Sequence, residues 1–473
     1  MPGAVIIAGN NLAAMVAAQS IATTGRQVAL VNPAAQWGGH FAGLKLDSRR
    51  FDPGMVLYEF SASNREPSPD VRGYDPTRRN DCGRFTGIVR DYVEQRVRTV
   101  IAPDPAVFID GRAMPDMVIA NHAASVTSFD GKTCESIRQE LKAICAAGPH
   151  LLHASRKSVD PAFSGLDFAS VSIANHGRTL HEVLFEPLCR KILGVACSDI
   201  LAIYHRAAWL PLYYPETLLS QFGATPQRLP DTRFHYPAEG SAGALVRALA
   251  HEIEAHPNIR TIRSAIAKIS RTAPTTLELV DGNTVSANEF IWTLDPGALL
   301  AIADPATPGT EIARSTIGLC FVAVGQDHIR PGLGTVFVPE AKRAIYRVTD
   351  QEGCAHLKAD EHRLVVEFSP EILAGRGLAS AEEQEQALLH ELADLGLIDT
   401  PRSVAYCAVK ILTNALMIPN NANRSAFLQQ QDWLHRHLPA IRLAGPSAGF
   451  HVGAMNDQIV QGLKLAAELG ATA

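Results

Sequence analysis

The chain has 473 residues, of which 47% are hydrophobic and 19% charged, and its formal net charge is −5. This length exceeds one ordinary hydrophobic core, so we expect two domains. The acidic balance and the absence of a lysine- or arginine-rich block argue against a nucleic-acid partner. The N-terminal apolar run is too short for a signal-peptide core or a membrane span, so the sequence predicts a cytoplasmic protein without a transmembrane segment.

The eight cysteines are scattered along the chain, and no two of them form a C-x-x-C pair. A structural zinc site and a thioredoxin-type motif are therefore not expected. We interpret the cysteines as free thiols in a reducing compartment and predict no metal site.

The first 32 residues predict a strand, a turn, a helix and a second strand. Apolar runs at 5–8 and 28–31 flank an alanine-rich stretch whose small side chains allow close packing on a sheet. The turn carries a degenerate dinucleotide-binding fingerprint, because its three glycine positions hold Gly9, Asn11 and Ala14. By itself this pattern fits a ligand-free strand–turn–helix unit equally well.

Asn11 stands where the backbone usually approaches a pyrophosphate. Asparagine tolerates left-handed backbone better than other non-glycine residues, and its side-chain amide can donate to a phosphate. Asn32 ends the second strand, where an acidic residue usually holds a ribose hydroxyl. The cofactor-binding residues predicted from this unit are Gly9, Asn10, Asn11, Leu12, Ala13, Ala14 and Asn32.

Further along the chain, residues 61–82 are polar and predict a long loop, and a helix is expected from Gly83 to about Arg98. Apolar positions at helical spacing from Leu180 to Leu193 predict a mostly helical insertion over about residues 160–230.

The second half of the chain predicts more regular elements. Residues 242–255 form an amphipathic helical pattern, and residues 275–293 form a hairpin pattern that turns at Asp281-Gly282-Asn283. Further extended segments are expected at 317–324, 344–349 and 363–368, and the last 30 residues predict a strand, a glycine-rich loop and a helix.

Five segments resemble, in the same order, segments of the flavin amine oxidase-like superfamily, particularly its protoporphyrinogen oxidase and UDP-galactopyranose mutase branches. They are VNPAAQWGGHFAG (31–43), RFDPGMVLYEF (50–60), GRTLHEVLFEPLCRKILGVACSDILA (177–202), FHYPAEGSAGALVRALA (234–250) and LAGPSAGFHVGAMNDQIVQGLKLAAEL (443–469). The Gly-Gly pair of the first segment lines the flavin in the family, and the last segment resembles the family's terminal flavin-binding motif.

The resemblance implies an α/β fold with a Rossmann-type FAD-binding domain and a discontinuous substrate domain made of a mixed sheet and the helical insertion. The FAD-binding domain is expected at residues 1–60, 235–300 and 435–473, and the substrate domain at 61–234 and 301–434. The implied cofactor is non-covalently bound FAD, and the implied partner is a small-molecule substrate. The resemblance also places Gly38, Gly39, His40, Gly445, Met455, Asn456 and Asp457 near the flavin.

Two residues are candidates for catalysis. His40 follows the Gly-Gly pair and is a candidate proton shuttle, with a hydrogen-bonded loop histidine as the alternative. Arg347, together with Glu367, lies in segments similar to the arginine-bearing strand of the mutase branch. We interpret Arg347 as a binding group for an anionic substrate, with a surface strand arginine as the alternative.

Three functions stay open from the sequence. The leading prediction is an FAD-dependent oxidoreductase in which the substrate gives a hydride to the flavin. The second is a non-redox, flavin-dependent sugar-nucleotide mutase, although Pro446, Phe450 and Val452 replace the arginine and two tyrosines of that branch. The third is a binding protein that keeps the fold without flavin, which the replacements at Asn11 and Asn32 support.

Overall fold

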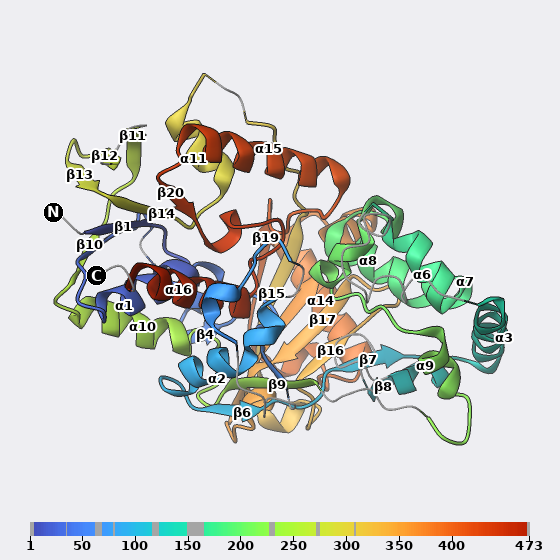
Figure 1. Cartoon of the computed structure of the whole chain (residues 1–473). Coiled ribbons are helices and arrows are strands. Elements are labelled where there is room, and N and C mark those ends of the chain that lie inside the picture. The colour runs from blue at the N-terminus through green and yellow to red at the C-terminus, as the bar shows by residue number, and fades with distance from the viewer. Residues whose placement is uncertain are drawn as a thin grey trace.

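The computed structural model of the chain is shown in Figure 1. It describes residues 4–34, 36–61, 69–78, 81–115, 123–148, 165–226, 232–270, 275–306 and 309–470. Within these residues, none of the helices combines the length and the apolar character needed to cross a bilayer.

One part of the molecule is built on a five-stranded parallel sheet with the strand order β10-β2-β1-β14-β20. Its strands are β1 (Val5–Ala8), β2 (Val28–Val31), β10 (Ile259–Ile262), β14 (Glu289–Trp292) and β20 (Ile441–Leu443). The sheet therefore joins segments that lie more than 400 residues apart in the sequence.

Both faces of the parallel sheet are covered, which explains its uninterrupted apolar strands. Val5 and Ile7 pack under helices α1 (Leu12–Ala22), α10 (Ala244–Ala255) and α16 (Met455–Gly470). Ile6 and Ala8 face the antiparallel strands β11 (Ile266–Ile269), β12 (Thr275–Leu279) and β13 (Thr284–Ala287), with helices α11 (Pro296–Ala303) and α15 (Asn421–His437). Figure 1 shows these two layers on opposite sides of the sheet.

The second half is built on a seven-stranded mixed sheet with the order β19-β15-β18-β17-β16-β7-β8. Helix α14 (Ala381–Asp394) packs its leucines on one face of this sheet. The strands are β7 (Ala106–Ile109), β8 (Arg112–Pro115), β15 (Ile317–Gly325), β16 (Thr335–Phe337), β17 (Ile345–Asp350), β18 (Glu361–Phe368) and β19 (Val404–Leu412).

A helical layer packs on the other face of the mixed sheet, against β7, β16 and β17. It contains α3 (Gly131–Ala147), α6 (Phe168–His176), α7 (Arg178–Leu180), a π-helical turn (His181–Phe185), α8 (Glu186–Leu193) and α9 (Pro215–Ser220). The predicted helical insertion is thus confirmed over residues 165–226, and its two ends at 160–164 and 227–230 lie outside the described residues.

The other predicted helices and strands are confirmed with small shifts at their ends, whereas residues 62–68 and 79–80 of the predicted loop at 61–82 lie outside the described residues. The amphipathic helix is α10, the hairpin is β12–β13, and the three extended segments are β15, β17 and β18. The helix expected from Gly83 to Arg98 is shorter, because a 3-10 turn at Asp81–Phe85 precedes α2 (Thr86–Glu94).

The expected domain boundaries stay a prediction. The strands of the parallel sheet all fall within 1–60, 235–300 and 435–473, whereas the mixed sheet lies within 61–234 and 301–434. A third sheet, made of β5 (Tyr58–Ser61), β6 (Thr99–Ile101) and β9 (Thr232–Pro237), crosses these boundaries and ties the two parts together.

Candidate functional site

Separate chain segments meet beyond the carboxyl ends of β1 and β14. Asn11, in the turn after β1, forms an isolated parallel bridge with Gly38, and the Gly38 N–H donates to the Asn10 carbonyl at 2.5 Å. Gly445, after β20, packs on the same turn, because a Cβ added to it would lie 3.0 Å from Asn11 Nδ2. The carboxyl edge of a parallel sheet is the usual place for a ligand crevice in this type of fold.

Gly9 occupies the first fingerprint position, and the backbone there requires glycine. Its φ is +141°, and a Cβ at this position would lie 2.0 Å from Thr293 Oγ1. Only glycine fits such a turn, because a side chain would be strained in the backbone and would clash with the residue after β14.

Asn11 does not adopt the left-handed backbone that asparagine tolerates. Its φ of −78° and ψ of 175° are those of an extended N-cap, and its Oδ1 accepts from the Ala14 N–H at 3.1 Å. Its Nδ2 donates to the Thr293 carbonyl in a short contact. The carboxamide therefore serves helix α1 and the adjacent strand end.

The second amide at the start of α1 is also bonded to a side chain. The Ala13 N–H donates to Gln458 Oε1 at 3.2 Å, while Gln458 Nε2 donates to the Gly453 carbonyl at 2.8 Å. The neutral side chains of Asn11 and Gln458 thus accept hydrogen bonds from backbone N–H groups at the start of α1, which could otherwise bind an anion. The side chains of Leu12, Ala13 and Ala14 are buried, so only backbone groups of this turn can face a ligand.

Asn10 and Asn32 hold the loop that follows β2. Asn32 is 2% exposed, and its Oδ1 accepts from the Ala34 N–H at 2.8 Å. The Nδ2 atoms of Asn10 and Asn32 both donate to the Gln36 carbonyl, at 3.1 and 3.5 Å. The asparagine that replaces the usual acidic residue is therefore engaged in a local turn.

Gly39 and His40 are exposed beside this turn. They begin a short 3-10 helix, Gly39–Ala42, and a Cβ on Gly39 would meet nothing closer than Asn11 Cα at 3.9 Å. Desolvation lowers the pKa of His40 although its own surface is open.

The N-terminus of α16 falls at the predicted position, but its first side chains point into the protein. Met455 is 6% exposed and packs in the core shared with α1. Asn456 Nδ2 donates to the Glu59 carbonyl at 2.9 Å, and Asp457 accepts from the Tyr74 hydroxyl at 2.8 Å. Burial raises the pKa of Asp457. The exposed residue at this helix start is Ala454.

Arg347 lies in the mixed sheet, so the alternative of a surface arginine is wrong. Its Nε and NH2 atoms bind the two carboxylate oxygens of Glu367 at 2.5 Å each, and Glu367 also accepts from the Met55 N–H at 3.1 Å. Arg347 is 6% exposed, and its buried NH1 atom has no hydrogen-bond partner among the described residues. Trp209 and Phe337 flank the guanidinium, with ring centres 6.0 and 5.3 Å from Cζ.

Asp52 is a structural centre that the sequence reasoning did not single out. It is 1% exposed and accepts from the Tyr236 hydroxyl at 2.5 Å and from the Ala242 N–H at 3.0 Å. Burial raises the pKa of Asp52 to about 6, although these hydrogen bonds act in the opposite direction. Asp52 thereby joins the segment at 50–60 to the segment at 234–250. Both segments were found in the sequence by their resemblance to the superfamily, and this was the only sequence signal that pointed to Asp52.

Lys191 has a similar role in the helical layer. Its Nζ is buried and donates to the carbonyls of Val338 and Ile345, at 2.9 and 3.0 Å. Burial lowers the pKa of Lys191 to about 7. Lys191, which belongs to the segment at 177–202, thus joins α8 to the turn between β16 and β17. Its partner Ile345 lies two residues before Arg347.

The arrangement is a Rossmann-type α/β fold with a second, mixed-sheet half and a helical layer, which is the fold of flavin amine oxidase-like enzymes. No protein-family model matches the chain, and no curated protein matches it by sequence. The likeness is therefore seen in the structure.

Three solved structures illustrate this likeness over nearly the whole chain. Reduced UDP-galactopyranose mutase superposes with a TM-score of 0.75 at 15% identity, covering 100% of this chain and 96% of that one. A protein provisionally named protoporphyrinogen oxidase from Exiguobacterium sp. 255-15 gives 0.67 at 16% identity, with 100% of both chains covered. Cyclohexylamine oxidase from Brevibacterium oxydans IH-35A gives 0.61 at 14% identity, covering 100% and 99%. The resemblance inferred from the sequence is confirmed at the level of the fold.

Proposed function

We propose that the protein is an FAD-dependent oxidoreductase that acts on a small-molecule substrate. The observation that carries this proposal is the meeting of the β1–α1 turn, the Gly38–Gly39 pair, Gly445 and the start of α16 at one edge of the parallel sheet. The neighbours in fold supply the class of cofactor, because UDP-galactopyranose mutase and the oxidases share this architecture.

The residues at this edge fit a dinucleotide with one qualification. Gly39, His40 and Ala454 are exposed there, and the space around Gly39 is open. The first-turn amides of Ala13 and Ala14 are bonded to Gln458 and Asn11, so a pyrophosphate has to displace neutral carboxamides or use other amides of the turn. Backbone amides of Gly9–Ala14, the loop at Gly38–His40 and the residues preceding Met455 are the groups that we assign to FAD.

A bound flavin supplies hydride acceptance, and the protein supplies position and electrostatics. His40 is exposed, and desolvation lowers its pKa, which favours the neutral imidazole as a proton acceptor for the substrate. Arg347 offers its remaining NH1 donor to an anionic group of the substrate, while Glu367 fixes the guanidinium plane.

The test begins with the colour of the purified protein. We expect flavin absorbance bands, and acid precipitation should release a compound that co-elutes with FAD and not with flavin mononucleotide. Anaerobic addition of an oxidisable substrate should bleach the bands, and oxygen or another acceptor should restore them. A colourless protein that gains no flavin absorbance with excess FAD contradicts the proposal and favours a flavin-free binding function.

A second function, a flavin-dependent sugar-nucleotide mutase, is favoured by one observation. The free donor of Arg347 suits a phosphate oxygen, and the mutase is among the similar structures. Such an enzyme works with reduced flavin and leaves its redox state unchanged after each turnover. Isomerisation of a nucleotide sugar only after dithionite reduction, with no net bleaching in the oxidative assay, would select this function.

A further inference from the structure

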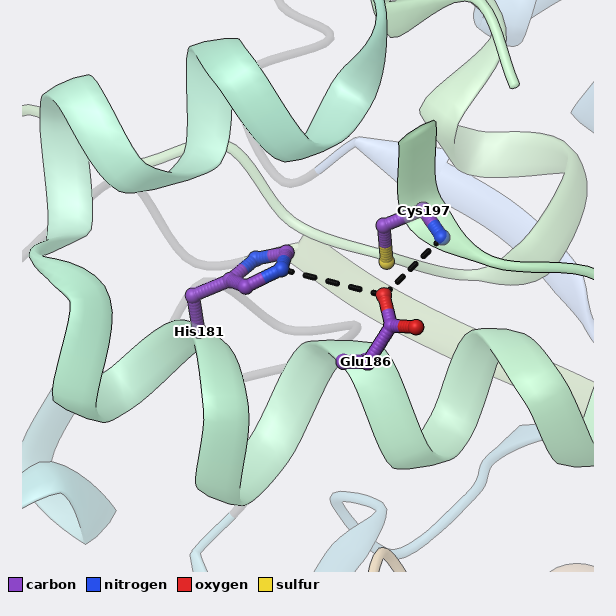
Figure 2. A group of neighbouring side chains, drawn as sticks. All are labelled: His181, Glu186 and Cys197. Carbon is purple, nitrogen blue, oxygen red and sulfur yellow. Dashed lines mark hydrogen bonds and ion pairs between the residues drawn. The ribbon is translucent and has the colours of Figure 1, made fainter. Parts of the chain in front are cut away.

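A cluster of potential metal ligands lies in the helical layer, away from the parallel sheet. His181, Glu186 and Cys197 each offer one ligand atom, and these three atoms all lie within 4.8 Å of one another (Figure 2). From this geometry we propose that His181, Glu186 and Cys197 form a binding site for a zinc-class transition-metal ion. The site is independent of the proposed flavin chemistry.

The spacing of the ligand atoms suits a tetrahedral ion. His181 Nε2 lies 3.7 Å from Glu186 Oε2. Zinc bonds of about 2.0–2.3 Å at tetrahedral angles separate neighbouring ligand atoms by roughly 3.3–3.8 Å. Imidazole nitrogen, thiolate sulfur and carboxylate oxygen are the donor types that zinc takes in proteins. Since the ligand atoms lie within 4.8 Å of one another, the longest separation has to shorten by up to about 1 Å around such an ion.

A π-helical turn brings two of the ligands to the same side of their helix. His181 and Glu186 are five residues apart, which on a regular α-helix places them about 140° apart around the axis. The turn at His181–Phe185 is π-helical, and the Glu186 N–H donates to the His181 carbonyl. This wider turn stacks the two residues, and such π turns are frequent at functional sites.

Cys197 returns to the same helix because the chain reverses after α8. The helix ends at Gly194, whose φ of +71° is a left-handed C-cap. A short 3-10 turn then begins at Cys197, and the Cys197 N–H donates to Glu186 Oε2 at 2.9 Å. Figure 2 shows the sulfur and the carboxylate on the side of the helix that carries His181.

The ligands are oriented by partners on their outer sides. His181 Nδ1 lies 3.1 Å from Ser172 Oγ, which leaves Nε2 directed at the cluster. Arg190 Nε binds the other oxygen of Glu186, Oε1, at 2.7 Å. Metal-binding histidines and carboxylates in proteins characteristically have such outer partners.

The charge and burial of the cluster also suit a divalent ion. A dication with one thiolate, one carboxylate and one neutral imidazole has no net charge, which limits the desolvation cost in the interior. His181 is 5% exposed and Cys197 is fully buried. The ion would link the π turn, α8 and the loop after α8, and three protein ligands would leave a fourth position for water.

A second cluster, formed by Asp350, Glu352 and His362, provides an internal contrast. In this cluster Arg363 binds Glu352, and His362 Nδ1 lies 2.8 Å from Asp350 Oδ2. It contains no thiol, so a spectroscopic signal from a thiolate–metal bond separates the two clusters.

Cobalt(II) is the probe for the proposed site. The full-length protein is analysed for zinc as purified, stripped with a chelator and titrated with Co²⁺. We expect zinc in the purified protein and, after titration, a thiolate-to-cobalt charge-transfer band with visible bands of tetrahedral cobalt at one ion per chain. Zinc should displace the cobalt and abolish the bands, and it should raise the Tm of the stripped protein.

Variants assign the ligands. Cys197→Ser should abolish the charge-transfer band, and His181→Gln should weaken cobalt binding about 10-fold or more. Cys145→Ser changes a half-buried thiol on α3 outside the cluster and should leave the titration unchanged. Circular dichroism checks that each variant is folded, and if the cluster variants do not fold, the wild-type metal content and cobalt spectrum decide.

Three results would overturn the site. One is a wild-type protein that contains no metal and shows no cobalt–thiolate band. Another is a band that persists in a folded Cys197→Ser protein. The third is a thiol count of six in denaturant, in place of the eight cysteines of the sequence, with a disulfide mapped to Cys189–Cys197, whose thiols are hydrogen-bonded to each other.

Discussion

The turn after β1 and the buried Arg347 are both candidate ligand-binding regions, but their polar groups are satisfied to different degrees. At the turn, the N–H groups of Ala13 and Ala14 are bonded to side-chain amides of the protein. In the mixed sheet, Arg347 uses two guanidinium nitrogens on Glu367, and its buried third nitrogen has no partner within the part of the chain that the structure describes.

This difference indicates how each region responds to a ligand. A ligand at the turn has to compete with existing hydrogen bonds, so it gains only the difference between two sets of bonds. A ligand oxygen at Arg347 satisfies a donor that is otherwise costly to bury. The turn after β1 is therefore expected to keep its hydrogen bonds without a ligand, whereas Arg347 is expected to favour a ligand that carries a hydrogen-bond acceptor.

Removing the arginine is the most severe test of this comparison. Arg347→Met leaves Glu367 buried without its ion pair, so we expect a loss of about 3–5 kcal/mol in the free energy of unfolding, measured by urea denaturation. The double variant Arg347→Met/Glu367→Leu should recover much of this loss while still failing to bind an anionic substrate. A single variant as stable as the wild type would show that the pair is solvated.

Asp52, which joins the segment at 50–60 to the segment at 234–250, gives a pH-dependent test. Its pKa is raised from 3.8 to about 6, so the folded protein holds this proton more tightly than the unfolded chain. The free energy of unfolding should therefore fall as the pH rises from about 4 to 6, by about 3 kcal/mol from this group. Asp52→Asn, which mimics the protonated form, should remove that part of the slope in unfolding curves measured at several pH values.

The control for this test is Glu383, an exposed carboxylate whose pKa is not raised. Its pKa is lowered by the Ser380 hydrogen bonds, so Glu383→Gln should leave the fall in stability between pH 4 and 6 in place. An unchanged slope in Asp52→Asn would show that another group carries the effect.

A negative charge at the start of α16 tests whether this helix reaches the cofactor. The sequence suggests Met455 as the position to change, but Met455 is packed in the core, and a glutamate there would unfold the protein. Ala454 is exposed, so Ala454→Glu should keep the fold while lowering FAD affinity about tenfold or more through repulsion of the pyrophosphate. Ala454→Gln is the neutral control, and equal flavin content in both variants would place the helix start away from FAD.

The smallest effect is expected at Asn11. Asn11→Gly removes the carboxamide that occupies the Ala14 N–H, so FAD should bind severalfold more tightly, with only a few tenths of a kcal/mol lost from the helix cap. Asn11→Asp keeps the cap but adds a negative charge, so it should bind FAD more weakly. Fluorescence titration with FAD measures both, and unchanged affinity in Asn11→Asp would move the pyrophosphate off this turn.

The sequence predicted the elements whose signals are local. Alternation and turn chemistry located the β12–β13 hairpin, and the apolar spacing from Leu180 to Leu193 located the helical layer. The hydrogen bonds of Asn11 could not be predicted, because its side chain donates to the carbonyl of Thr293, which lies 282 residues further along the chain.

The candidate site was predictable only in part for the same reason. The motifs named the segments that meet at the turn, but Asp52 and Lys191 act through partners that no local pattern specifies. The cluster of His181, Glu186 and Cys197 has no familiar ligand spacing, since it depends on a π turn and on the chain reversal at Gly194.

The packing of α16 on α1 has a consequence for synthesis on the ribosome. A Cβ on Gly462 would lie 2.6 Å from Val16 Cβ, so these helices are in close contact, and β20 completes the same sheet. The segments of the mixed sheet, from β7 to β19, have all been translated before β20 and α16 exist. The mixed sheet can therefore assemble on the nascent chain, whereas the parallel sheet waits with an exposed apolar edge, a state in which chaperone binding is expected.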